Sequence, residues 1–246
     1  MFSKKETQQQ TTTTPQVKSE QAKAEYHVAV CVKDTNQENG PGHVTALLIK
    51  KKEGKTEIRT TSFYPGFFGS IVNGLTFGSI PVSGQLATDH KQDVEEATHI
   101  LTTQVTKDQF KGAKKGQNEF TEDVIKGHST YSVFADANPL VNGFKHLLQG
   151  ASGSQRVVEK TKKETGCHPL EDVFGFPVYD DNHPEVPEMK VDNCASSVTH
   201  VIKGAGFKNF ENPNIPTLFT PALEKHGFTK VDKDSFIKEY CRGFKS

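Results

Sequence analysis

Cys194 has the local sequence of a cysteine nucleophile. It follows Asp192 and Asn193, two residue types that favour the N-cap of a helix, and it precedes the helix-like segment ASSVTHVI. Backbone N–H groups and the positive end of the helix dipole lower the pKa of a thiol at a helix N-terminus. The N–H groups around Asn193 and Ala195 can also stabilise the oxyanion that forms when a thiolate attacks a carbonyl. One helix start would therefore supply both the nucleophile and the oxyanion site.

The other three cysteines fit this chemistry less well. Cys31 lies in a segment of alternating apolar residues and Cys241 in the last expected helix, so we expect both to be packing residues. Cys167 is the rival nucleophile, but it lies in an expected loop next to His168, with no helix N-terminus to activate it. The alternative for Cys194 itself is an ordinary buried cysteine on a helix face, because free cysteine is among the most buried residue types.

His43 is the best placed of the ten histidines to serve as the base. In GPGHVTALLI it opens an expected strand directly after a Pro-Gly turn, where the sheet fixes the side chain yet leaves it at the rim. A cysteine nucleophile needs such a base within hydrogen-bond reach, and a third group that orients the base. His200, six residues after Cys194, should lie on a different helix face and should not reach the thiol. The alternative for His43 is a surface histidine at a strand start.

Several short motifs resemble permuted members of the NlpC/P60 superfamily. The resemblance rests on GHV at 42–44, SFYP at 62–65, DNCASSV at 192–198 and the Thr220–Pro221 helix start. In that superfamily a papain-like core is rearranged so that the histidine precedes the cysteine, as in the lecithin:retinol acyltransferase group. The resemblance pairs Cys194 with His43.

The resemblance also implies a third polar residue on the strand after the histidine strand. Thr60 and Ser62 are the candidates there, because that strand end has no Asp, Glu, Asn or His. We select Ser62, and three residues before the cysteine remain open as alternatives: Asp181, His183 and Asp192.

An aromatic residue near the oxyanion site is a further feature of the superfamily, about seven residues before the cysteine. This chain has Pro187 and Glu188 there instead. Tyr64 and Tyr179 are the aromatic residues that we expect at the substrate cleft.

The elements that position these residues follow from hydrophobic patterning. Three segments, Tyr26–Val32, Val44–Ile49 and Thr56–Phe63, predict a meander of antiparallel strands. Thr98–Val105 predicts another strand, followed by a helix that Thr106 caps. Further helices are expected over Pro139–Gln149, from Cys194 to the glycines at 204 and 206, after Thr220, and from Asp234 or Ser235 to Arg242.

The expected fold class is α+β. We predict a permuted papain-like core, with an antiparallel sheet packed against helices and an inserted segment between the histidine strand and the cysteine helix. Residues 1–24 have the Gln/Thr/Lys/Glu composition of a disordered tail, and 25–246 would form the enzyme domain, with 66–190 as its insertion or elaboration.

Residues 60–88 contain no charged side chain and are rich in Gly, Ser and Phe. A loop packed over the core is one interpretation of this stretch, and a greasy substrate channel or membrane-touching flap is the other.

The amino-acid composition limits the classes of partner that we expect. Thirty basic residues offset thirty acidic ones, which argues against nucleic-acid binding. The chain lacks an apolar signal-peptide core or spanning segment, so we expect synthesis in the cytoplasm. The frequent occurrence of the resembled family among bacterial effectors implies delivery into a host cell by a specialised secretion system. No cofactor is expected, and no metal, because the spacings of Cys167, His168, His183, Cys194 and His200 fit no zinc template.

We expect a cysteine hydrolase that acts on a peptide, amide or isopeptide bond through a Cys194 thiolate and the His43 base. One alternative is a lipid-directed acyltransferase or phospholipase-like thiol enzyme. The other is a catalytically weak binding module of the same fold. Substrate, acceptor and oligomeric state stay open.

Overall fold

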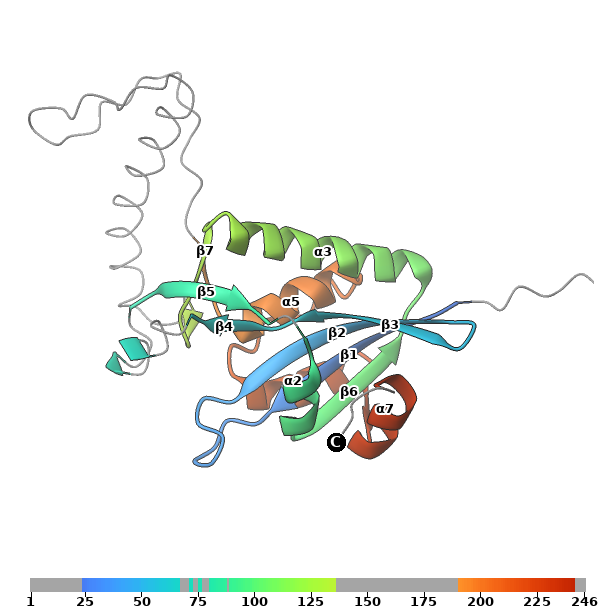
Figure 1. The fold of residues 1–246 in the computed structure, drawn as a ribbon. Coiled ribbons are helices and arrows are strands. Elements are labelled where there is room, and N and C mark those ends of the chain that lie inside the picture. The colour runs from blue at the N-terminus through green and yellow to red at the C-terminus, as the bar shows by residue number, and fades with distance from the viewer. Residues whose placement is uncertain are drawn as a thin grey trace, which may run out of the picture.

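A computed structural model describes residues 24–66, 71–72, 75–76, 80–87, 89–135 and 190–241 (Figure 1). Almost all of the expected tail, the expected helix at 139–149, Cys167 and the Pro-rich passage before 188 lie outside the described residues. The described part is α+β, with an antiparallel sheet and several helices, as expected. None of the described helices is both long and apolar enough to cross a membrane.

The main sheet has five strands in the order β3-β2-β1-β6-β9, and every neighbouring pair is antiparallel. The predicted meander is confirmed at its centre, and the strand predicted over 98–105 pairs with β1. The strands are β1 (Glu25–Lys33), β2 (His43–Lys52), β3 (Lys55–Thr61), β6 (His99–Gln104) and β9 (Thr229–Val231).

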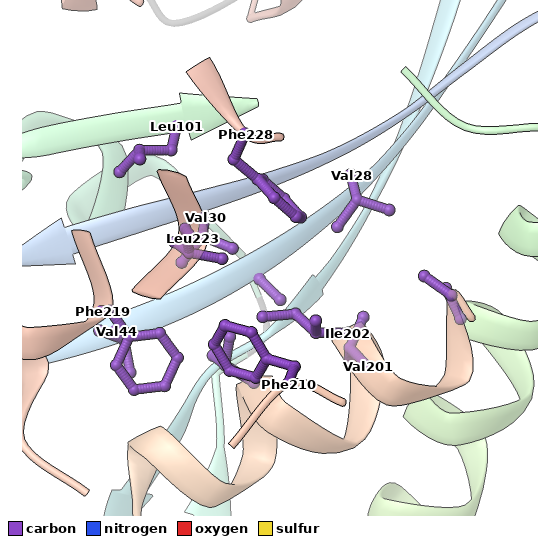
Figure 2. Close-up of a cluster of buried hydrophobic side chains, with 14 of the residues drawn as sticks. Val28, Val30, Val44, Leu101, Val201, Ile202, Phe210, Phe219, Leu223 and Phe228 are labelled. Carbon is purple, nitrogen blue, oxygen red and sulfur yellow. The ribbon is translucent and has the colours of Figure 1, made fainter. Parts of the chain in front are cut away.

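Both faces of this sheet are buried because successive side chains of a strand point to opposite faces. Val28 and Val30 of β1 join a cluster beneath α3 (Lys107–Ile125) and α5 (Cys194–Gly204), which also holds Ile202 and Phe210 (Figure 2). Ala29, Cys31 and their strand neighbours join a second cluster beneath α2 (Lys91–Glu96) and α7 (Lys233–Tyr240). Figure 1 shows these helix pairs on opposite sides of the sheet. Each fully buried Val or Leu contributes about 1.5–3 kcal/mol.

Local signals set the starts of the long helices. Thr106 and Gln109 form a capping box at α3, and Asn193 and Ser196 form one at α5. Thr106 was predicted as a cap, and Asn193 was one of two predicted caps. At α7 the prediction of Asp234 or Ser235 is wrong, because the Asp232 side chain accepts the Ser235 N–H.

A second, four-stranded sheet lies beside the first, in the order β4-β5-β7-β8. Its strands are β4 (Phe63–Pro65), β5 (Val82–Leu86), β7 (Ser129–Tyr131) and β8 (Lys190–Asp192), and β7 runs parallel to β8. β8 leads directly into α5, while β4 continues from β3. The small sheet therefore brings residues 62–65 and 192–194 to one end of the molecule.

The segment expected as an insertion or elaboration, 66–190, contributes two described elements to the core. β6 is an interior strand of the main sheet, and α3 packs along α5. After α5 come η2 (Pro216–Leu218) and α6 (Phe219–Glu224), so the helix predicted at Thr220 begins one residue earlier.

Glycines allow α3 and α5 to approach closely. A Cβ placed on Gly112 would lie 2.2 Å from the carbonyl oxygen of Gly204, and one on Gly116 would lie 2.6 Å from that of His200. Backbone atoms therefore meet directly where the two helices cross, and this contact fixes the position of the helix that carries Cys194.

Gly112→Ala should destabilise the protein by about 1–3 kcal/mol, because the new methyl group overpacks the helix contact. At a solvent-exposed helix position the same change stabilises by about 0.5–1 kcal/mol. The sign of the change in unfolding free energy therefore distinguishes a close helix contact from an exposed position. Urea unfolding measures the effect, with Lys111→Ala as the control, since the Lys111 side chain is 65% exposed. A Gly112→Ala variant that is as stable as the wild type would contradict the close approach.

Candidate active site

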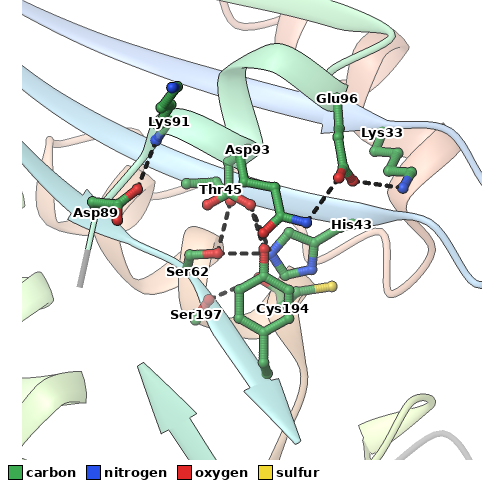
Figure 3. A network of polar contacts seen from close by, with 12 residues as sticks. Lys33, His43, Thr45, Ser62, Asp89, Lys91, Asp93, Glu96, Cys194 and Ser197 are labelled. Carbon is green, nitrogen blue, oxygen red and sulfur yellow. Dashed lines mark hydrogen bonds and ion pairs between the residues drawn. The ribbon is translucent and has the colours of Figure 1, made fainter. Parts of the chain in front are cut away.

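His43 is held at the first position of β2 by a turn that requires glycine. Gly42 has a φ of +70°, and a Cβ there would lie 2.5 Å from the carbonyl oxygen of Lys33. The His43 Nε2 atom lies 2.7 Å from Ser62 Oγ, which lies 2.9 Å from Thr45 Oγ1 (Figure 3). Ser62, the orienting group selected from the sequence, therefore lies within hydrogen-bond distance of the imidazole, between β3 and β4.

Tyr64 and Asp93 complete the surroundings of the imidazole. The Tyr64 ring stacks on His43 with centroids 4.0 Å apart and planes 11° apart, and its hydroxyl donates to Asp93 Oδ1. The same carboxylate oxygen lies 3.9 Å from His43 Nε2, and the two side chains are only 13% (His43) and 6% (Asp93) exposed. Tyr64 thus restricts rotation of the imidazole, while Asp93 lies near Nε2, the ring nitrogen that Ser62 also contacts.

Burial makes the neutral imidazole the resting form. It lowers the pKa of His43 from 6.5 to about 4, an effect that the nearby Asp93 carboxylate opposes only in part.

Cys194 occupies the first turn of α5, as predicted, but its thiol is not activated at rest. The backbone N–H groups of Val44, Ala195 and Cys194 itself favour the thiolate. Burial outweighs them, since the residue is 5% exposed, and raises the pKa of Cys194 from 9.0 to about 11. The expectation of a depressed pKa is therefore wrong, because desolvation of the thiolate exceeds the help from the helix N-terminus.

The backbone of β2 brings the two candidate residues together. The N–H group of Val44, the residue after His43, is within hydrogen-bond reach of the Cys194 sulfur. Figure 3 draws that sulfur and the His43 ring in the same close-up. Since Ser62 engages Nε2, the nitrogen left for the thiol is Nδ1.

Asn193 and Asp192, the residues before the nucleophile, have structural partners. The Asn193 side chain accepts the Ser196 N–H and donates to the carbonyl oxygens of Val133 and Asn214. Its backbone N–H donates to Ser196 Oγ at 2.9 Å, so the oxyanion role predicted for Asn193 has no free N–H group there. Asp192, an alternative orienting group, instead accepts a hydrogen bond from Ser129 Oγ at 2.7 Å.

The remaining predicted residues divide into three groups. Ala195 is fully buried behind Cys194. Cys31 and Cys241 are buried in the second cluster. The exposed His200 lies against Phe120 with its ring tilted by 39°, on another helix face as predicted. Tyr179, Asp181, His183 and the rival Cys167 lie outside the described residues.

Asp93 was missed by sequence reasoning. It lies in the charged segment KQDVEE, which reads as a solvated helix, and only the tertiary contact between α2 and the β1–β2 region buries it. Tyr131 was missed as well. It ends β7, is 6% exposed, and lines both cavities described below.

Two cavities meet at the candidate pair. The larger, of about 380 Å³, is lined by His43, Tyr64, Asp93 and neighbouring polar residues. The smaller, of about 120 Å³, is lined by Cys194 and mainly apolar residues. Within the described parts of the chain, no group of three or more His, Cys, Asp or Glu side chains could hold a metal ion.

Comparison with family models, curated proteins and solved structures found no match to this chain.

The depressed pKa of His43 predicts a loss of stability in acid. Folded His43 stays neutral down to about pH 4, whereas the unfolded chain binds a proton below about pH 6.5. The free energy of unfolding therefore has its full value above pH 6.5. It decreases as the pH falls towards 4, by at most about 3 kcal/mol, because only the unfolded chain takes up the proton. Urea unfolding of His43→Gln, which cannot titrate, should show a flatter pH dependence over this range. Parallel curves for the two proteins would contradict the assigned environment.

Proposed function

We propose that this chain is a thiol hydrolase in which Cys194 attacks a carbonyl and His43 accepts its proton. The observation that carries the proposal is the fixed imidazole: Ser62 lies 2.7 Å from Nε2, and the backbone N–H of the next residue, Val44, interacts with the Cys194 sulfur. We assign Nδ1 as the nitrogen that accepts the thiol proton. Three elements far apart in sequence converge here, which a packing cysteine and a surface histidine would not require.

The tautomer of His43 follows from this arrangement. For Nδ1 to accept a proton, Nε2 must carry the resting proton and donate it to Ser62 Oγ. Ser62 can then donate its own proton to Thr45 Oγ1, 2.9 Å away. Each group in this chain of hydrogen bonds has a partner, so the imidazole enters the reaction in one protonation state.

Acylation begins from an uncharged pair, because burial disfavours both the thiolate and the imidazolium. The S–H proton moves to His43 Nδ1 as the sulfur bonds to the carbonyl carbon. His43 then gives that proton to the leaving amine when the C–N bond breaks, which leaves a thioester on Cys194. Water then bonds to the thioester carbonyl carbon as it gives a proton to His43 Nδ1. The C–S bond breaks, His43 returns the proton to the sulfur, and the carboxylic acid leaves.

Two groups suit the charges that develop during these steps. The Asp93 carboxylate, 3.9 Å from Nε2, stabilises the transient imidazolium. The backbone N–H groups of Cys194 and Ala195 favour the thiolate, and in the proposed reaction they would stabilise negative charge on the sulfur and on the oxyanion.

The resemblance to permuted NlpC/P60 proteins agrees with this proposal. A histidine at the start of one strand, a polar residue on the next strand and a cysteine at a helix start are the parts that the resemblance implies. We assign the permuted papain-like core on these grounds, with Asp93 as an addition from outside the matched motifs.

A second candidate is transfer or removal of a lipid acyl group. It is favoured by apolar side chains that are exposed between β4 and β5, where Ile71 is 56% and Leu75 78% exposed. The same thiol chemistry would serve. Flotation with vesicles of neutral and anionic phospholipid tests this candidate, since Leu75→Ser should weaken membrane binding if these residues insert.

Alkylation kinetics test the proposed pair. Cys194 and Cys241 are 5% and 6% exposed, and burial raises both pKa values to about 11. Only Cys194 has a base beside it, so iodoacetamide at pH 7 should label it about tenfold or more faster than Cys241. His43→Ala should abolish this difference, as read by peptide mass spectrometry. Equal labelling in the wild type would refute the pair.

Substitution of the orienting groups gives a second test, with N-acetyl-leucyl-aminomethylcoumarin as substrate. Asp93→Asn should lower kcat by about 10²–10³-fold, because the imidazolium loses its counter-charge, and Ser62→Ala by about tenfold. Asp93 raises the pKa of His43, so Asp93→Asn should also move the acid limb of the kcat/KM profile to lower pH.

The matched control is Asp89→Asn, because Asp89 is exposed and only caps the Lys91 N–H at the start of the same helix. If Asp93→Asn and Asp89→Asn behave alike, Asp93 has no part in the reaction.

A further inference from the structure

The candidate thiol and its base open into different cavities. Cys194 lines the 120 Å³ cavity together with Phe134, Ile215 and Pro216, whereas His43 lines the 380 Å³ cavity. The two cavities share Pro41, Gly42, Tyr131 and Val133, so they lie next to each other.

The proposed reaction assigns one end of the substrate to each cavity. The acyl part becomes covalently bound to the Cys194 sulfur, so it must occupy the space beside that sulfur. The amine part must receive a proton from His43, so it must occupy the space beside the imidazole. The acyl part therefore lies in the small cavity and the amine part in the large one.

The walls of the small cavity match a compact apolar group. Val133, Phe134, Ile215 and Pro216 line it beside the polar Thr35, Tyr131 and Asn214, and none of the described residues that line it is charged. Its volume of about 120 Å³ is slightly less than the roughly 150 Å³ of an apolar cavity that accommodates benzene in another protein. A branched aliphatic side chain fits this space, while a charged one would lose its hydration with no opposite charge among the described lining residues to replace it.

The large cavity differs in both size and chemistry. Its volume of about 380 Å³ lies within the range of small-molecule sites, and Lys33, Gln92 and Glu96 line it. Asp93 lines it as well, and the Asp93 Oδ2 atom is buried without a hydrogen-bond partner among the described residues. A buried acceptor of this kind suits an N–H donor, which a leaving amine supplies.

We propose that the substrate is an amide with a small branched aliphatic side chain on the acyl side of the scissile bond and a polar amine on the other. This inference rests on the proposed function, because it needs Cys194 to carry the acyl group. It adds the orientation of the substrate and names Ile215 and Phe134 as specificity-determining residues.

A series of N-acetyl-aminoacyl-aminomethylcoumarin substrates tests the inference with the full chain. The aminoacyl residue is Gly, Val, Leu, Phe, Glu or Lys in turn. We expect kcat/KM for Val and Leu to exceed that for Gly and Glu by about 10–200-fold, the range that contacts in an apolar pocket produce.

Variants of the small cavity sharpen the test. Ile215→Asp should remove the preference for Leu and raise the relative kcat/KM for Lys. Ile215→Ala should shift the preference towards Phe, because it enlarges the cavity. Leu218→Asp is the matched control, since Leu218 is exposed (48%, against 41% for Ile215), lies three residues away and does not line the cavity.

The outcomes separate this inference from the proposed function. Suppose that Cys194→Ala abolishes hydrolysis. If the wild type then does not discriminate Leu from Gly, or if neither Ile215 variant changes the preference, the inference is overturned and the proposed hydrolase function stands. Absence of Cys194-dependent hydrolysis across the whole series overturns both.

Discussion

The packing of α5 against β2 is the contact on which the rest of the site depends. It buries the apolar face of α5 in the cluster beneath the sheet, and it sets the first turn of the helix against the backbone of Val44. The glycine contact between α3 and α5 and the capping box at Asn193 leave the helix start little freedom. Hydrophobic packing of α5 against the sheet therefore positions Cys194 near His43.

The same burial that brings the pair together also keeps it uncharged. Desolvation lowers the pKa of His43 and raises the pKa of Cys194, and both shifts favour the neutral form of the side chain. A site of this kind gains little reactivity in its resting state. In the proposed reaction, Asp93, Ser62 and the N–H groups of α5 would stabilise the charges that develop on the imidazole and the sulfur.

Sequence reasoning succeeded where local chemistry determines structure. Alternating apolar residues predicted the strands, and Thr106 and Asn193 predicted the starts of α3 and α5. Ser62 was predicted from its place on the strand after His43. Asp93 could not be predicted, because a carboxylate in a short charged helix resembles any solvated one until the tertiary fold buries it. The pKa of Cys194 was predicted with the wrong sign for a related reason, since a helix N-terminus is visible in sequence and the depth of burial is not.

Trapping of the acyl-enzyme tests the central claim most directly. The protein is mixed with p-nitrophenyl isobutyrate, quenched in acid within one turnover, and mapped by peptide mass spectrometry. We expect one isobutyryl group on Cys194 in the wild type and none on this residue in His43→Ala. An acyl group on Cys167 or another residue, with Cys194 unmodified, would contradict the assignment of the nucleophile.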